Sequence, residues 1–298
     1  MNNVKSVFSI KDLENLSGIK AHTIRIWEKR YNVLRPMRTD TNIRYYDTAA
    51  LQKLLNISLL HNHGYKISKI SKLDEDRIPA MVNEIISRKS VGLHAVNAFK
   101  IAMMHFDQAL FIETYDRLLA DKTFPEIFYE VVLPLMEEIG LLWQTNTVTP
   151  AQEHFISNLV RQKILVNTEK LQTLAPTRHE KIFVLYLPEG EIHEIGLMFL
   201  NYEIMRHGYK AIYLGANVPL SCLKDVKKYF DNITYITYFT IAPHPDEILA
   251  YIDKLYDGVI SREAEVWLLG RNTAALEPAT LPEKIKTFQS IDRCVKEL

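Results

Sequence analysis

A histidine and a glutamate two residues apart are the side chains in this sequence best suited to chemistry. His193 follows Glu191 in the segment Glu-Ile-His-Glu-Ile-Gly, which ends at Gly196. An imidazole is a common transition-metal ligand, and a nearby carboxylate can orient the ring and raise its basicity. A histidine in a surface loop near a helix start is also a common structural feature, so the pair alone leaves both interpretations open.

The elements around this pair are predicted to place it at the edge of a sheet. Strand patterns alternate with helical patterns from residue 176 to residue 298, which is typical of a doubly wound, Rossmann-like α/β domain. Such sheets bind ligands at the carboxyl ends of their strands, where we expect His193. The expected strands cover residues 182–187, 210–214, 233–239 and 264–269.

The middle of the chain, residues 74–175, is predicted to form a helical bundle. Pro125 and Pro150 fall where helices are expected to begin, a position that tolerates proline. Apolar side chains recur at helical spacing in two stripes. The stripes are Leu110, Thr114, Tyr115, Leu118 and Leu119, and Ile156, Leu159, Val160, Ile164 and Leu171.

The net charge of zero conceals a basic N-terminal segment. Residues 1–72 carry 13 Lys and Arg against 5 Asp and Glu, a net of +8, whereas the remainder carries 23 against 31. A basic segment on an acidic body is typical of a nucleic-acid-binding head. A merely solvated basic face is the alternative.

Residues 1–73 predict a winged helix-turn-helix domain. Ser9 is a suitable N-cap for a first helix that ends near Gly18, and residues 35–46 predict a β-hairpin wing. Asp47 would cap a further helix with Leu51, Leu54, Leu55 and Leu59 inside. In the second helix, at about 20–31, helical spacing places Ile24, Trp27 and Tyr31 inward and His22, Arg25 and Lys29 outward.

The block from Thr23 to Tyr31, followed by Arg44-Tyr45-Tyr46, resembles the MerR family of transcriptional regulators. The Trp27-Glu28 pair particularly resembles the members that are fused to cobalamin domains. The resemblance implies a double-stranded DNA operator as partner. It implies phosphate contacts from Arg25, Arg38 and Arg44 and contacts nearer the bases from His22 and Thr23, with Lys29, Arg30, Arg35 and Tyr46 completing the expected DNA-binding set.

The segment around His193 resembles the Asp-x-His-x-x-Gly motif of cobalamin-binding domains, with Glu191 in place of the aspartate and Gly196 as the glycine. The segment 208–219 resembles the second strand and loop of the same family. The resemblance implies that His193 replaces the cofactor's own base as the lower ligand of cobalt. The extra methylene of Glu191 is expected to loosen its hydrogen bond to the ring without abolishing it.

Two further positions depart from the cobalamin family. Its Ser-x-Leu motif falls on Thr237-Tyr-Phe239, and its Gly-Gly pair falls on Leu269-Gly270. The family's small residues make room for the tail of cobalamin. Phe239 and Leu269 therefore add volume along that path, and overpacking typically costs about 1–3 kcal/mol.

Trp143, Glu153 and His154 form a Trp-x(9)-Glu-His motif in the bundle. Taken alone, they are a core aromatic residue and two solvated residues near a helix start. The motif resembles the upper-face motif of the light-sensing, cobalamin-dependent MerR repressors, the CarH group, which implies contacts around an adenosyl ligand. In those sensors a histidine follows the tryptophan. Here Gln144, a poorer cobalt ligand, puts the light-exposed bis-histidine state in doubt, and His154 is a candidate substitute.

The order of head, bundle and α/β domain leads us to expect a regulator, not an enzyme. We expect a corrinoid, with adenosylcobalamin as the leading ligand and light as a narrower hypothesis, to control operator binding and a dimeric or tetrameric state. One alternative is a cobalamin-independent regulator whose C-terminal body binds a partner protein or only oligomerises. Another is a corrinoid-carrying methyltransferase subunit, against which the basic head counts heavily.

The composition excludes several other classes. No apolar run approaches the ~20 residues of a membrane span. The two cysteines, Cys222 and Cys294, form no metal-site spacing and argue against a disulfide scaffold. We therefore expect a cytoplasmic protein without a membrane partner.

Overall fold

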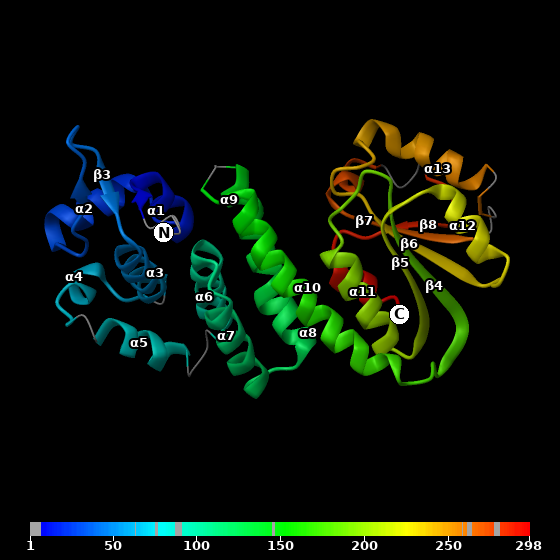
Figure 1. Cartoon of the computed structure of the whole chain (residues 1–298), viewed down its shortest axis with the longest axis horizontal. Coiled ribbons are helices and arrows are strands. Elements are labelled where there is room, and N and C mark those ends of the chain that lie inside the picture. The colour runs from blue at the N-terminus through cyan, green and yellow to red at the C-terminus, as the bar shows by residue number, and fades with distance from the viewer. Residues whose placement is uncertain are drawn as a thin grey trace. The chain divides into compact units, whose positions relative to one another are not determined.

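A computed structural model gives the structure of this protein (Figure 1) and describes residues 7–62, 64–74, 77–86, 91–144, 147–257, 259–260, 264–276 and 281–298. The chain forms two compact units, Met1–Leu159 and Val160–Leu298. Helix α10 (Pro150–Gln172) contains the boundary between them. Within the described ranges, no helix is long and apolar enough to cross a membrane.

The first unit begins with a winged helix-turn-helix, called the head below, as predicted. Its sheet has the antiparallel order β1-β3-β2. Ser9 and Asp12 form a reciprocal capping box, and Gly18 ends the first helix at a φ of 73°, which glycine adopts without strain. The head consists of β1 (Phe8–Ser9), α1 (Ile10–Ser17), α2 (Ala21–Tyr31), β2 (Met37–Arg38), β3 (Arg44–Tyr46), α3 (Thr48–Asn62) and α4 (Ile67–Ile70).

Helical bundle segments follow the head. Thr123 caps α8 with Glu126, and a π-helical turn, η1, interrupts the run from α8 to α9. Most of the predicted stripe residues are buried, but Leu119 is 41% exposed, so that part of the prediction is wrong. The segments are α5 (Arg77–Ile86), α6 (Val91–His105), α7 (Gln108–Asp121), α8 (Phe124–Ile127), η1 (Phe128–Val132), α9 (Leu133–Gln144) and α10.

The second unit contains a parallel five-stranded sheet in the order β5-β4-β6-β7-β8. This confirms the doubly wound α/β prediction and adds the fifth strand, β8, which was not predicted. Helices lie on both sides of the sheet (Figure 1). The elements are β4 (Arg178–Pro188), α11 (Ile195–Arg206), β5 (Tyr209–Val218), α12 (Leu220–Lys227), β6 (Ile233–Tyr238), η2 (Pro245–Glu247), α13 (Ile248–Tyr256), β7 (Glu265–Leu269), η3 (Arg271–Ala275), β8 (Ile285–Thr287) and α14 (Ile291–Val295).

The strand order sets the place of the site. The chain passes from β4 to β5 on one side and then returns to β6 on the other. The loops that leave the carboxyl ends of β4 and β6 therefore diverge, and open α/β sheets bind ligands in the crevice at such a switch point. Glu191 and His193 lie in the loop after β4.

Candidate functional site

The carboxylate of Glu191 orients the ring of His193. Glu191 is completely buried, and its Oε1 lies 2.7 Å from Nδ1 of His193. The same oxygen accepts hydrogen bonds of 2.9 Å from the backbone amides of Ile192 and His193. The longer glutamate side chain therefore retains the expected hydrogen bond to the ring.

The second oxygen of Glu191 binds the loop after β6. Oε2 accepts hydrogen bonds from the backbone amides of Thr240 (2.7 Å), Ile241 (2.7 Å) and Ala242 (3.2 Å). A single buried carboxylate therefore joins both loops at the switch point. The position of the His193 ring depends on this connection, because the imidazole itself is half exposed.

The charge of Glu191 determines which nitrogen of the His193 imidazole carries the proton. Burial by itself raises the pKa of the Glu191 carboxyl, but hydrogen bonds from His193 and from backbone amides outweigh it and lower the pKa to about 2. An ionised carboxylate can only accept hydrogen bonds. Nδ1 of His193 therefore carries the proton, and in the neutral ring the lone pair lies on Nε2, as a metal ligand requires.

The low pKa of Glu191 predicts acid-sensitive stability. The carboxyl binds its proton more readily in the unfolded chain, so its contribution is complete above about pH 4.5 and is lost as the pH falls toward 2. We expect about 2 kcal/mol to be lost between pH 5 and pH 2.5, measured by urea unfolding across that range. Glu191→Gln should lose the part of this dependence that comes from Glu191. Glu265, whose pKa is also about 2, should retain its own part, and an unchanged pH profile would contradict the prediction.

Three other residues expected at the cofactor lie in the same unit. Gly196 lies in the first turn of α11 beside the ring of Tyr238, whose Cζ is 3.0 Å from where a Cβ would stand. Thr237 is fully buried beside Tyr186 of β4. Gly270 has a φ of 103° and packs against the backbone of Phe239.

The donor set at His193 fits a corrinoid cobalt, because an imidazole nitrogen with a fixed ring orientation is a suitable metal ligand. The deeper positions are tightly filled. Phe239 is fully buried, with its ring edge-on to Tyr251 at 5.5 Å, and Leu269 is 1% exposed. Both side chains therefore lie within the core of this unit, and the obstruction of the cobalamin tail remains a prediction.

A second polar cluster holds the loop of His193 and was missed by the sequence analysis. Glu194 forms an ion pair with Arg161 of α10 and accepts a hydrogen bond of 3.0 Å from the hydroxyl of Tyr213. Burial, followed by the charge of Glu194, raises the pKa of Tyr213. The position of Glu194 directly after His193 was the one signal in the sequence.

The residues of the upper-face motif belong to the first unit. Trp143 is 57% exposed near the end of α9. Glu153 and His154 lie in the first turn of α10, where Nδ1 of His154 is 2.7 Å from a carboxylate oxygen of Glu153. The side chain of Gln144 lies outside the described part of the structure.

The head exposes most of the residues expected at DNA. Arg44 is half buried and forms an ion pair with Glu28. Tyr46 is fully buried and donates a hydrogen bond of 2.6 Å to the same carboxylate. Its predicted role as a DNA contact is therefore corrected to one in the core. The exposed members are His22, Arg25, Lys29, Arg30, Arg35 and Arg38, and Thr23 is partly buried.

Comparisons with known proteins match the head and the helical bundle to family profiles. The MerR HTH family regulatory protein profile matches residues 8–76, and a B12 binding domain profile matches residues 95–166. The HTH-type transcriptional repressor CarH of Myxococcus xanthus is 30% identical over 219 residues, covering 71% of this chain and 72% of that protein. The repressor CarA of the same organism is 25% identical over 223 residues, covering 72% and 70%.

A solved structure shows the same fold. The monomethylamine corrinoid protein of Methanosarcina barkeri has a TM-score of 0.55 at 15% identity, covering 67% of this chain and 94% of that one. At this identity the likeness concerns the fold alone. The relatives that match along most of the chain are transcriptional repressors, not enzymes. The chain therefore belongs to the MerR-family transcriptional regulators that carry a B12-binding domain.

Proposed function

We propose that this protein is a transcriptional regulator whose operator binding and oligomeric state are controlled by a corrinoid held on His193. The observation that carries the proposal is the buried Glu191 carboxylate, which orients the imidazole at the switch point of the sheet. Metal-ligating histidines commonly donate their other ring N–H to a carboxylate in this way. When bound in its adenosyl form, the corrinoid supplies a cobalt centre with a light-sensitive cobalt–carbon bond.

The chain's own residues divide the proposed work. His193 would hold the cobalt, Thr237 and Gly270 would contact the rest of the cofactor, and Trp143 would shield the cofactor from water. Glu153 and His154, already joined to each other, would contact the adenosyl group. A change of oligomeric state, to a dimer or a tetramer, would decide how many heads engage one operator, and avidity would then couple the ligand to DNA.

A cobalamin-independent regulator is the second candidate. The full burial of Phe239 and Leu269 and the contact of Tyr238 with Gly196 favour it, because these side chains fill space that small residues would leave open. In that case the second unit binds a partner protein or only oligomerises.

A visible absorption titration decides between the two candidates. Adenosylcobalamin added in the dark to the full chain should shift the spectrum to a histidine-ligated form, and His193→Ala should abolish that shift. His179 is an exposed histidine near the amino end of β4. The control variant His179→Ala should show the same spectral shift as the wild type. If the wild type shows no shift at high micromolar ligand, the cobalamin-independent candidate stands.

The same samples test control of DNA binding. Size-exclusion chromatography and gel-shift assays on operator DNA should differ between the free and ligand-bound protein, and green light should reverse the difference. A bound ligand that leaves both oligomeric state and DNA affinity unchanged would separate corrinoid binding from regulation. A change with ligand that green light does not reverse would contradict light sensing alone.

A further inference from the structure

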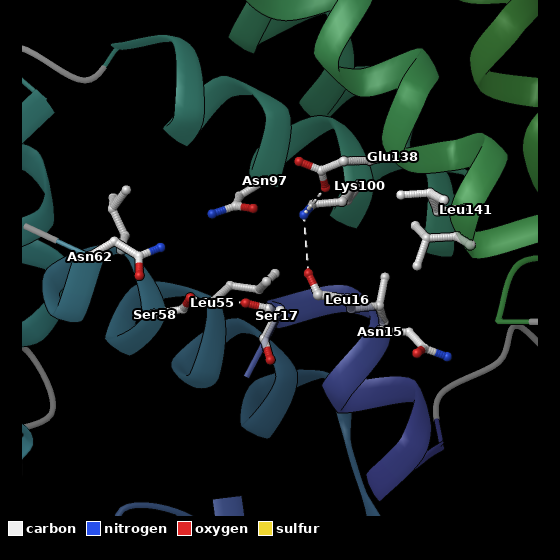
Figure 2. A pocket seen from close by; sticks show the side chains of 13 residues that line it. Asn15, Leu16, Ser17, Leu55, Ser58, Asn62, Asn97, Lys100, Glu138 and Leu141 are labelled. Carbon is white, nitrogen blue, oxygen red and sulfur yellow. Dashed lines mark hydrogen bonds and ion pairs between the residues drawn. The ribbon is translucent and has the colours of Figure 1, made fainter. Parts of the chain in front are cut away.

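A pocket of about 390 Å³ lies between the head and the bundle, within the first unit (Figure 2). Its walls come from α1 and α3 of the head and from α6 and α9 of the bundle. No described residue of α2 or of the wing strands β2 and β3 contributes to it. The head therefore meets the bundle across a partly hollow contact that is separate from α2 and the wing strands.

A buried lysine crosses this contact. Lys100 of α6 is only 4% exposed, and its Nζ donates hydrogen bonds to the backbone oxygen of Leu16 (3.1 Å) and to Oε2 of Glu138 (2.6 Å). Figure 2 shows both bonds meeting at the ammonium group. Buried lysines are rare unless they are paired. The two acceptors, one in the head and one in the bundle, explain why Lys100 can be buried.

The bond to Leu16 acts on the end of a helix. The last carbonyls of a helix lack intrahelical partners and carry partial negative charge. Lys100 satisfies the carbonyl of Leu16 in α1, while Ser58 of α3 donates a 3.0 Å hydrogen bond to the carbonyl of Ser17. The bundle therefore supplies a charged cap that the head does not contain.

A second bond reaches α1 from the connection between α9 and α10. Nδ2 of Asn15 donates a hydrogen bond of 2.7 Å to Oγ1 of Thr147. Glu138 and Thr147 lie on either side of Trp143 in the sequence. Glu138 is therefore linked to α1 through Lys100, and Thr147 is linked to it directly.

We propose that Lys100 is a latch that holds the head on the bundle and makes the position of α1 follow that of α9. Glu138 is a positioning residue that acts on the head through Lys100. The latch itself follows from these contacts alone. A role for the latch in passing a signal from the bound ligand to the DNA-binding head rests on the proposed function. That role requires Trp143 to respond to a bound corrinoid.

Hydrogen–deuterium exchange of the full chain, without corrinoid or DNA, tests the latch independently of ligand binding. Lys100→Met should raise exchange in α1 peptides roughly tenfold, because it removes the buried donor that the Leu16 carbonyl and Glu138 share, and it should also raise exchange at the end of α9. Glu138→Gln, which keeps the shape of the side chain, should produce a smaller increase in the same peptides. Arg117→Met, which breaks the exposed pair with Glu113, is the matched control and should leave α1 unchanged.

The Glu138 variant separates a latch from a local cap. If Lys100→Met exposes α1 while Glu138→Gln behaves like the wild type, Lys100 only caps α1 and the proposal is overturned. Unchanged exchange in both variants overturns it as well. If Lys100→Met fails to fold, the Glu138→Gln result alone decides. Because no corrinoid is present, failure here is distinct from a failed spectral titration.

Discussion

Glu191→Ala is expected to lower the free energy of unfolding of the α/β unit by about 3–5 kcal/mol. The substitution removes the acceptor for the His193 ring and for backbone amides in two loops. Amides left without partners at a buried position each lose their hydrogen bond, although water entering at the sheet edge recovers part of the loss. Urea unfolding followed by tyrosine and tryptophan fluorescence measures the change.

Two matched variants test whether the lost hydrogen bonds of Glu191 cause the loss of stability. Glu189→Ala removes an exposed carboxylate from the same loop and should change stability by no more than about 0.5 kcal/mol. Glu191→Gln keeps the size of the side chain but replaces one acceptor oxygen with a donor, so it should be intermediate. In the spectral titration it should weaken corrinoid binding roughly 10–100-fold through the misplaced ring. A loss below about 1 kcal/mol for Glu191→Ala would mean that the two loops hold their positions without the carboxylate.

Gly270→Ala should be among the most damaging single substitutions, with an expected loss of about 3 kcal/mol or more. A Cβ there would stand 2.6 Å from the carbonyl oxygen of Phe239 and 2.7 Å from its amide nitrogen. These are backbone atoms, and both are engaged, since Phe239 bonds to Leu269 and to Asn272. The φ of 103° at Gly270 adds backbone strain for any L side chain.

Gly140→Ala is the control for that result. Gly140 lies in α9, and nothing stands within 4 Å of its absent Cβ, so alanine should stabilise the helix by about 0.5–1 kcal/mol. Thermal unfolding monitored by circular dichroism compares the two variants. Equal melting temperatures for Gly270→Ala and the wild type would show that the loop after β7 can move away from Phe239.

Local signals allowed much of the fold to be predicted. The Ser9 cap, the Gly18 stop and the buried faces of α2 and α3 each depend on residues within one or two helical turns. Strand β8 escaped prediction because it is only three residues long, Ile285–Thr287, which is too short for an alternating pattern to emerge. Its pairing with β7 is a tertiary property.

In the site, likewise, only the contacts between residues close in the sequence could be predicted. Glu191 and His193 are two residues apart, so their contact could be inferred from spacing. The amides of residues 240–242 that bind Glu191 are about fifty positions away, and Tyr213 and Arg161 reach Glu194 from other elements. Tyr46 was misplaced because β3 pairs with β1 as well as β2. Because of that pairing, the side chain of Tyr46 points into the core.

The bridge made by Glu191 has a consequence for protein engineering. A graft of residues 189–196 into another α/β sheet would carry the imidazole and its carboxylate but not the three amides that hold one carboxylate oxygen. The transferable unit is discontinuous, since it needs the turn after β6 as well. A proline at 240, 241 or 242 would remove one of those donors without touching the motif itself. A search for related proteins by the histidine motif alone would therefore accept chains in which the ring has no fixed orientation.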